Sequence, residues 1–338
     1  MTSLRPHVSV VIPAFGDPAP VVAAVHRLLA IPAELHVEVI VVDNDPQRGL
    51  PALLPRSPRL HLVEPGYNTG FTGAINRGIK FSRGEFVLFH NADARINHDY
   101  LATLVAFMHV HPNVGAASGK TVRTGAAGER VIDSAGIAMR RDRSAYDRGE
   151  GAPDDGRFAA AEEVFAVSGA ALFARRAALD DVAIDGEYLP ASFFMYKEDI
   201  DLCWRLRLRG WECWYVPAAV AEHDRGGRGV GGAGYLRALG RYFQNERTKA
   251  THNRVHSTKN EILMMVRNEG GLPVRDLPRI LLRQAALHAV TLLFAPRAEV
   301  RSLFLLAGAL SPAIRARRVI QRRAVVDPRS IPRRWFRP

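Results

Sequence analysis

The first 120 residues alternate short apolar runs, rich in β-branched residues, with segments that have helical periodicity. The apolar runs are nearly continuous, which is typical of strands that are buried on both faces of a sheet. We therefore predict an α/β fold in which helices cover both faces of a mostly parallel sheet. The predicted strands are residues 8–13, 36–43, 59–64 and 85–90, and the predicted helices are residues 18–30, 70–82 and 99–110.

Short polar segments follow three of these predicted strands. The carboxyl ends of parallel strands lie at one edge of a sheet, and ligands bind beyond that edge. Asn, Asp and Gly also form ordinary turns and helix caps, so each segment taken alone has a simpler explanation. Three such segments at one edge favour a shared binding site. The polar residues are Asp43 and Asn44 after the second strand, Asn68 and Gly70 after the third, and Asn91 and Asp93 after the fourth.

A cluster of carboxylates, Glu198, Asp199 and Asp201, directly follows the apolar run FFMY. The next residues predict a helix that stops at Gly210, so the acids could simply cap this helix and complement its dipole, with Asp199 as the cap. The apolar run supports a second interpretation, because it draws the start of the helix into apolar surroundings. A desolvated carboxylate at a helix N-terminus is a typical general base. The residues leave both interpretations open.

The middle of the chain is less regular. Residues 121–160 contain many turn signals and predict hairpins and a mobile loop, whereas residues 162–176 predict a further strand. In that strand, Gly169 would let a ligand approach the backbone closely. The segment GVGGAG formally matches a dinucleotide-binding pattern, but no strand precedes it. We predict a flexible lid there instead, with Arg225 and Arg228 able to contact phosphate.

The positive charge of the chain is confined to its C-terminal part. Residues 271–338 carry 14 arginines and three acidic residues, whereas the formal net charge of the whole chain is +12. A nearly neutral body with a basic tail predicts an anionic partner for the tail. A nucleic acid is disfavoured as that partner, because only Trp335 and Phe336 provide aromatic side chains among the terminal arginines.

Two segments of the tail, residues 276–295 and 302–314, have wide apolar faces flanked by arginines. This pattern is typical of an anchor that lies in the membrane interface, where basic residues are attracted to anionic lipids. Neither segment is expected to reach the length that spans a bilayer. The alternatives are that these helices pack on the rest of the chain or on a second subunit in a homo-oligomer.

The cysteine content bears on the compartment. Cys203 and Cys213 are the only cysteines, and they indicate neither a disulfide framework nor a zinc site. This usage is typical of the reducing cytoplasm. The N-terminus runs directly into a predicted strand, so we expect no signal peptide. Together with the basic tail, this predicts a cytoplasmic protein that is peripheral at the inner face of the cell membrane.

Several motifs occur together in the order found in a known enzyme family. They are VSVVIPAF, VIVVDN, NTGFTGAINRG, GEFVLFHNAD, VSGAALFARRAAL and the run FFMYKEDIDLCWRLRLRGWECWYVPAAVAEH. Over residues 7–225 the chain resembles the inverting family-two glycosyltransferases, in the branch that includes bacterial rhamnosyl- and galactofuranosyltransferases. The resemblance implies an A-type glycosyltransferase fold, which is Rossmann-like, with a C-terminal helical appendage. We expect residues 1–232 to form a catalytic domain that binds a nucleotide sugar, and residues 233–338 to form the appendage.

The resemblance also implies roles for individual residues. Asp199 would remove the proton of the acceptor, with Glu198 beside it. Asp93 would bind a divalent cation, Mg²⁺ or Mn²⁺, although the neutral Asn91 stands at the companion position of this motif. His223 would add a nitrogen ligand, which favours Mn²⁺. The residues implied in donor binding are Asp43, Asn44, Asn68, Gly70, Asn76, Asn91 and Asp93, with Asp43 reading the uracil or thymine base.

The expected activity is transfer of a sugar from a nucleotide diphosphate to a lipid-linked or polysaccharide acceptor in cell-wall or surface glycan synthesis. Rhamnose from TDP-rhamnose is the first expected donor, and a UDP-sugar (galactofuranose or hexosamine) is the second. Two other classes stay open. One is a sugar-nucleotide-binding protein without activity, which the weakened metal motif would explain. The other is a nucleic-acid-binding protein, which would leave Asp43, Asp93 and Asp199 without a role.

Overall fold

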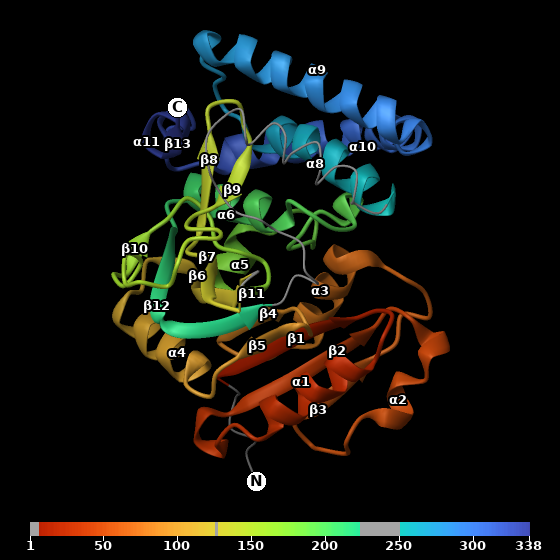
Figure 1. Cartoon of the computed structure of the whole chain (residues 1–338), viewed down its shortest axis with the longest axis vertical. Helices are drawn as coiled ribbons and strands as arrows, with labels where there is room; N and C mark the ends of the chain where they lie inside the picture. The colour runs from red at the N-terminus through yellow and green to blue at the C-terminus, as the bar shows by residue number, and fades with distance from the viewer. Residues whose placement is uncertain (1–6, 126–127, 224–250) are drawn as a thin grey trace.

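The apolar runs of the N-terminal half form four neighbouring parallel strands in the order β4-β1-β2-β3. Figure 1 shows them in the computed structural model, which describes residues 7–125, 128–223 and 251–338. Three of the four are buried along almost their whole length, as their continuous apolar sequence predicts. The strands are β1 (Val8–Ala14), β2 (Val37–Asp43), β3 (Leu60–Val63) and β4 (Phe86–His90), so all four predicted strands are confirmed.

The second half of the sheet is mixed rather than parallel. β11 (Ala171–Arg175) lies between β4 and β6 (Val114–Thr124) and runs antiparallel to both, while β12 (Glu212–His223) runs parallel to β6. The shorter strands β5 (Ala94–Ile96), β7 (Arg130–Ser134) and β10 (Glu162–Glu163) pair at its edge. The strand character predicted for residues 162–176 is confirmed in two separate strands, β10 and β11.

Hairpins occupy residues 121–160, as predicted. β6 and β7 form one antiparallel pair, and β8 (Ile137–Arg140) forms another with β9 (Ala145–Asp147). The C-terminal strand β13 (Phe336–Arg337) pairs with β8 and completes a small three-stranded sheet. The end of the chain is thus joined to its middle.

Helices cover both faces of the main sheet. On one face, α1 (Ala19–Leu29) and α4 (Tyr100–Val110) pack on the side chains of β1 and β4 that point toward them. On the other face, α3 (Gly70–Phe81), α5 (Arg176–Val182) and α6 (Glu198–Leu208) pack on the alternate side chains. The remaining helix of this part, α2 (Leu50–Leu53), is a single turn, so the predicted layers are confirmed.

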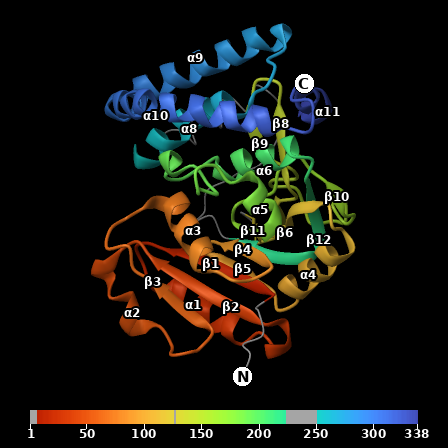
Figure 2. The same ribbon diagram turned by 180° about the vertical axis from the view of Figure 1, so that it is seen from behind.

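The C-terminal helices lie at the far end of the molecule from β1–β3, with α6 between, as both views show (Figures 1 and 2). They are α8 (Thr251–Asn268), α9 (Leu277–Phe294), α10 (Pro296–Arg323) and α11 (Ser330–Trp335). The helical prediction is therefore confirmed for the described residues. Residues 302–314, predicted as an apolar segment, lie inside the longer α10, which continues through Pro312.

One expectation about the tail needs correction. The 3₁₀ turn η4 (Val274–Asp276) leads directly into α9, and together they give 21 residues, Val274–Phe294, that are long and apolar enough to cross a membrane by length and composition. The prediction that residues 276–295 do not reach the length that spans a bilayer is therefore wrong by length and composition. In the 18-residue apolar window of this stretch, 22% of the residues are buried inside the protein.

The C-terminal helices and the main sheet share one hydrophobic core. Leu263 and Met264 of α8, together with Leu306 of α10, belong to the same buried cluster as Trp204 of α6 and Val11 of β1. The predicted domain boundary at residues 232/233, and the predicted lid with Arg225 and Arg228, lie outside the described residues. The division into two domains therefore stays a prediction.

Candidate active site

Asp43 is the last residue of β2 and is buried at the carboxyl edge of the sheet. Its Oδ1 accepts a hydrogen bond from the backbone N–H of Asp45 at 3.0 Å. Its Oδ2 has no partner among the described residues. A buried acceptor without a donor is costly, so this oxygen is suited to accept a hydrogen bond from a ligand.

Asn44 shapes the neighbouring loop. Its Oδ1 accepts hydrogen bonds from the backbone N–H and the hydroxyl of Thr69, and its Nδ2 donates to the carbonyl of Gly70. The exposed Asn68 accepts a hydrogen bond from the N–H of Gly70 at 2.9 Å. Gly70 has φ +71°, and a Cβ there would lie 2.5 Å from the carbonyl oxygen of Phe194. These residues therefore bring the start of α3 against the segment before α6.

Asn76 is buried in α3, and its amide is engaged by the protein itself. Nδ2 donates to the carbonyl of Leu189, while Oδ1 accepts from the backbone N–H groups of Tyr188 and Leu189. The prediction that Asn76 lines the donor pocket finds no support in this geometry. The amide instead fixes the chain that leads to the acidic cluster.

Asp93 follows β4 and faces His223 at the end of β12. The distance between Asp93 Oδ1 and His223 Nε2 is 3.4 Å, and the Asp93 side chain is 54% exposed. On its other side, His223 Nδ1 lies 3.3 Å from Oδ2 of Asp133, a fully buried residue of β7. Burial alone would lower the pKa of His223, but these two carboxylates raise it to about 9. Burial alone would raise the pKa of Asp93, but the hydrogen bond and the charge of His223 lower it.

These residues fit a divalent cation. A carboxylate oxygen and an imidazole nitrogen 3.4 Å apart can both lie about 2.1 Å from one ion. Histidines that bind metals usually direct their other ring nitrogen to a carboxylate, as His223 does toward Asp133. Groups of three or more metal-binding side chains do not occur in the described residues, so the protein would supply two ligands and the substrate the others. Sequence reasoning missed Asp133, since nothing in its local pattern marks it.

Asp199 lies in the first turn of α6, which begins at Glu198 with Lys197 as the N-cap. The capping interpretation of Asp199 is therefore wrong. Its Oδ2 accepts a hydrogen bond from the N–H of Gly169 at 3.0 Å, and its Oδ1 accepts one from Ile200 at 2.8 Å. Gly169 lies just before β11, between the two strands of residues 162–176.

Burial changes the protonation of the two neighbouring carboxyl groups. Burial, reinforced by the charge of Asp199, raises the pKa of Glu198 to about 8. Burial also raises the pKa of Asp199, although its two backbone donors act in the opposite direction. Glu198 Oε2 has no hydrogen-bond partner among the described residues. The Glu198 carboxyl group is therefore mostly protonated at neutral pH.

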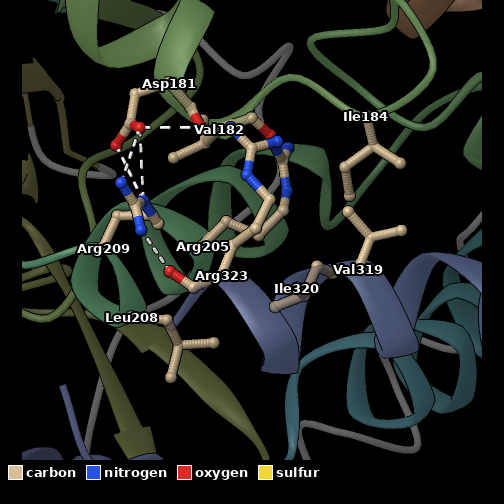
Figure 3. A pocket seen from close by; sticks show the side chains of 9 residues that line it. All are labelled: Asp181, Val182, Ile184, Arg205, Leu208, Arg209, Val319, Ile320 and Arg323. Carbon is tan, nitrogen blue, oxygen red and sulfur yellow. Dashed lines mark hydrogen bonds and ion pairs between the residues drawn. The ribbon is translucent and has the colours of Figure 1, made fainter. Parts of the chain in front are cut away.

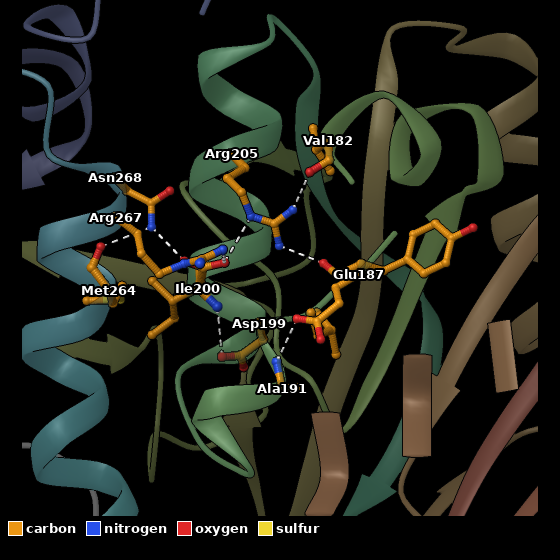
Figure 4. A network of polar contacts seen from close by, with 12 residues as sticks. Val182, Glu187, Ala191, Asp199, Ile200, Arg205, Met264, Arg267 and Asn268 are labelled. Atoms are coloured by element: carbon orange, nitrogen blue, oxygen red, sulfur yellow. Dashed lines mark hydrogen bonds and ion pairs between the residues drawn. The ribbon is translucent and has the colours of Figure 1, made fainter. Parts of the chain in front are cut away.

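Asp201, the third acid of the cluster, has a structural role. It is fully buried and forms ion pairs with Arg205 of α6 and Arg267 of α8, and it accepts a hydrogen bond from Asn268. Figure 4 labels these three partners. Burial alone would raise the pKa of Asp201, but these partners lower it. The acid thus anchors α8 to α6.

Hydrogen-bonded bridges connect the three predicted positions at one edge of the sheet. From Asp43, the chain passes through Asn44 to Gly70 and Thr72, whose N–H donates to the carbonyl of Phe194 just before the acidic cluster. A second bridge is made by the loops after β4 and before β11. The N–H of Asn91 donates to the carbonyl of Ala170, and the adjacent Gly169 donates to Asp199.

A small hollow lies elsewhere, between α5, α6 and α10 (Figure 3). Asp181 in its wall forms an ion pair with Arg209, and its backbone carbonyl accepts a hydrogen bond from Arg323. These contacts attach α10 to α5. The hollow is therefore part of the packing of the C-terminal helices and is separate from the sheet edge.

Comparisons with known proteins agree with this geometry. Residues 9–182, just over half of the chain, match the family model described as Glycosyl transferase family 2. The chain is 28% identical over 261 residues to the N-acetylglucosaminyl-diphospho-decaprenol L-rhamnosyltransferase of Mycobacterium tuberculosis. The aligned region covers 67% of this chain and 77% of that protein.

Two solved structures are also similar. The crystal structure of GalNAc-T7 with UDP, GalNAc and Mn²⁺ has a TM-score of 0.56 and 12% identity, over 78% of this chain and 48% of the other. A mannosyltransferase from Pyrobaculum calidifontis, in complex with GDP-Man and Mn²⁺, has a TM-score of 0.49 and 20% identity, over 96% of this chain and 82% of the other. The first likeness, with the family match, confirms the predicted A-type fold.

Proposed function

Because the chain belongs to glycosyl transferase family 2, we propose that it is an inverting enzyme that moves a sugar from a nucleotide diphosphate to an acceptor hydroxyl. The observation that carries this proposal is the connection of Asp43, Asp93 and Asp199 at one edge of the sheet through hydrogen-bonded bridges. Each of the three supplies a group that the reaction needs: a nucleotide contact, a place for the cation, and a base.

Asp199 acts as the general base. It accepts the proton of the acceptor hydroxyl while the hydroxyl oxygen attacks the anomeric carbon from the face opposite the diphosphate. The new carbon–oxygen bond forms as the bond from the anomeric carbon to the diphosphate breaks, so the configuration inverts. The two backbone donors fix the direction of the carboxylate. The neighbouring Glu198, with a pKa of about 8, stays protonated at neutral pH and adds no second charge.

Asp93 and His223 would hold the divalent cation, and Asp133 orients the imidazole ring through its other nitrogen. The cation, when bound, neutralises the negative charge that develops on the leaving diphosphate. The GalNAc-T7 structure contains Mn²⁺, and the nitrogen ligand here also favours Mn²⁺ over Mg²⁺. Because Asn91 provides no second carboxylate, a bound cation would need further oxygen ligands from the substrate.

Asp43 recognises the base of the nucleotide. Its unpartnered Oδ2 accepts a hydrogen bond from the ring N–H of uracil or thymine. This acceptor is paired with none of the described residues, and burial withdraws it from bulk water. Asn44, Asn68 and Gly70 are hydrogen-bonded to one another in the adjacent loop. They therefore shape the donor site more than they bind the donor directly.

The relative from Mycobacterium tuberculosis is named as a rhamnosyltransferase that acts on N-acetylglucosaminyl-diphospho-decaprenol. We therefore assign TDP-rhamnose as the first donor, a UDP-sugar as the second, and a polyprenyl-diphosphate-linked saccharide of cell-wall or surface glycan synthesis as the acceptor. A screen of these donors, by thermal shift and product formation with and without Mn²⁺, tests the assignment. Donor binding without turnover for every acceptor supplied would point to a sugar-nucleotide-binding protein instead.

Two perturbations test the catalytic roles. Asp199→Asn keeps the shape of the side chain but removes its basicity, so turnover is expected to fall at least about 10²-fold while donor affinity is kept. Asp155→Asn, at an exposed ion pair, is the matched control. Turnover of Asp199→Asn at the wild-type rate would remove Asp199 from the mechanism. Addition of EDTA should abolish turnover, and full activity in EDTA would exclude the cation.

The tail binds the membrane surface that carries the acceptor. The outward face of α9 is apolar: Leu282 is 72% exposed and Leu293 is 74% exposed. On its other side, Arg283 is paired with the buried Glu261 and His288 with the buried Glu299. Since these partners hold α9 against α8 and α10, the helix lies in the interface and does not span the bilayer.

Flotation with vesicles tests this location. The full chain is expected to bind vesicles that contain phosphatidylglycerol more strongly than neutral phosphatidylcholine vesicles, because the tail is rich in arginine. Leu282→Glu with Leu293→Glu should abolish binding. Val110→Glu, at an exposed apolar position of α4, is the control. If the double variant instead converted a dimer to a monomer without changing vesicle binding, the apolar face would be a subunit contact.

A further inference from the structure

The segment immediately before the catalytic carboxylates, residues 192–197, has an unusual backbone. Phe194, Tyr196 and Lys197 all have positive φ angles, of 66°, 73° and 71°. Residues with a side chain rarely adopt this conformation, because Cβ approaches the backbone carbonyl. Such a conformation persists only where the surrounding structure holds it, and it is frequent at functional sites. The holding groups come from outside the segment.

Asn260 of α8 is the first of these groups. It is fully buried, and its Nδ2 lies within hydrogen-bond distance of three carbonyl oxygens of the strained backbone. Its two N–H groups are shared among the carbonyl oxygens of Phe193 at 3.0 Å, Met195 at 2.8 Å and Tyr196 at 2.8 Å. A single side chain therefore defines the path of the segment.

Lys259 is the second holding group, and it fixes the orientation of the first. Its Nζ donates to Oδ1 of Asn260 at 2.6 Å and to the carbonyl of Ser192 at 2.6 Å. Because an ammonium group can only donate, Asn260 must present its oxygen to Lys259 and its nitrogen to the carbonyls. Lys259 is 1% exposed, so water does not compete for these bonds.

The opposite side of the segment contacts the donor loop. The carbonyl of Phe194 accepts a hydrogen bond from the N–H of Thr72 at 3.1 Å, and Gly70 approaches the same carbonyl closely. The segment is thus held between α3 and α8, and it ends at Lys197, the N-cap of α6. Any shift of this segment moves the first turn of α6, which contains Asp199.

We propose that Lys259 and Asn260 are positioning residues that hold the 192–197 segment and thereby set the place of the Asp199 carboxylate relative to the donor. The inference rests on the proposed function of Asp199 as the base. Helix α8 belongs to the C-terminal region, which the sequence predicts to be an appendage. With this inference, α8 contributes to the geometry of the active site. Neither residue touches the substrate; both act through the backbone that precedes α6.

Two variants of Asn260 test the proposal by steady-state kinetics on the full chain. Asn260→Asp keeps the shape but replaces the donor with a group that repels the three carbonyls, and Asn260→Ala removes the contacts. Displacement of a catalytic group by about 1 Å can reduce the rate about 10²-fold. We expect kcat to fall between 10- and 100-fold in both variants, whereas KM for the donor changes less than about 3-fold.

Ser302→Ala is the matched control, because it removes a buried hydrogen bond to the same helix, α8. Ser302 of α10 is buried and donates a hydrogen bond to the carbonyl of Val255 in α8, far in sequence from the 192–197 contacts. Its loss should lower thermal stability as the Asn260 variants do but leave kcat per folded molecule unchanged. If the Asn260 variants lose activity only in proportion to the folded fraction, or keep the wild-type kcat, the positioning role is wrong.

A second measurement is independent of the reaction. Gly169 N–H donates to Asp199, so amide hydrogen exchange at Gly169 reports the position of that carboxylate. Exchange there should accelerate in Asn260→Ala and stay at the wild-type rate in Ser302→Ala. Equal protection in all three proteins would overturn the proposal. If the wild type transfers no sugar but this difference is seen, the proposed function fails and the positioning of Asp199 by α8 stands.

Discussion

At the scale of single residues, Lys197 influences the ionisation of Asp199. Burial raises the pKa of Asp199, while the N–H groups of Gly169 and Ile200 and the charge of Lys197 act against this increase. As the proposed base, Asp199 works only when it is ionised, so activity should be lost as the pH falls through this raised pKa. Lys197→Gln removes one stabilising charge and raises the pKa further.

The acidic limb of the kcat/KM profile of Lys197→Gln should therefore move to higher pH, with little change in the plateau. The same substitution at Lys80, which is exposed on α3, should leave the profile unchanged. An acidic limb that does not move in Lys197→Gln would mean that the titrating group is not Asp199.

The sequence could indicate only part of this residue-scale picture. Positions after strands, with the family motifs, identified Asp93 and His223. Asp133 could not be predicted, because it contacts His223 across 90 residues of sequence and lies in an ordinary strand pattern. Asn260 could not be predicted for the same reason, since its partners lie 64 to 67 residues away in the sequence. Asn76 is predicted to line the donor pocket because it follows a binding loop. Its position in a helix does not reveal that its amide binds the backbone of Tyr188 and Leu189.

At the scale of elements, periodicity predicted the existence and type of most helices and strands, but not their neighbours. β1–β4 follow from continuous apolar runs, whereas β11 inserts antiparallel between β4 and β6 through pairings far apart in sequence. The N–H of Gly169, just before β11, likewise meets a partner far along the chain, Asp199, 30 residues later. Local pattern contains no information on such contacts.

The ion pairs of Asp201 join two elements, α6 and α8, and they should contribute strongly to stability. Asp201→Asn leaves the buried guanidinium groups of Arg205 and Arg267 without a carboxylate, so the free energy of unfolding should fall by about 3–5 kcal/mol. Urea denaturation at neutral pH measures this loss. The exposed pair of Asp155 and Arg157 provides the control, and Asp155→Asn should unfold at the wild-type urea concentration.

The pH dependence of this difference has a definite sign. The pKa of Asp201 is lowered in the folded protein from its ordinary value of 3.8, so its ionised form stabilises the fold above that value. As the pH falls through the folded pKa, the wild type loses the same charge that Asp201→Asn lacks. The stability difference should therefore be constant near neutral pH and shrink in strong acid. A difference that grows in acid would contradict the ion-pair explanation.

At the scale of the whole molecule, the C-terminal helices complete the core of the catalytic part. Leu263 and Met264 of α8 share one buried cluster with Trp204. Asp201 obtains two of its partners from α8, and the 192–197 segment is held by the same helix. A chain that ends at residue 223 would expose this apolar surface and leave Asp201 with a single cationic partner. We therefore expect the chain to fold as one cooperative unit.

Thermal unfolding of residues 1–223 tests this expectation. The fragment should show no cooperative transition and no donor-induced shift, whereas the full chain should show a single transition. Full-length Leu282→Glu, which changes only the exposed face of α9, is the control and should unfold at the wild-type temperature. A fragment that melts cooperatively and binds the donor would establish the predicted boundary at 232/233 as a true domain boundary. In that case the C-terminal region would serve only to place the enzyme at the membrane, and Lys259 and Asn260 would have no part in the active site.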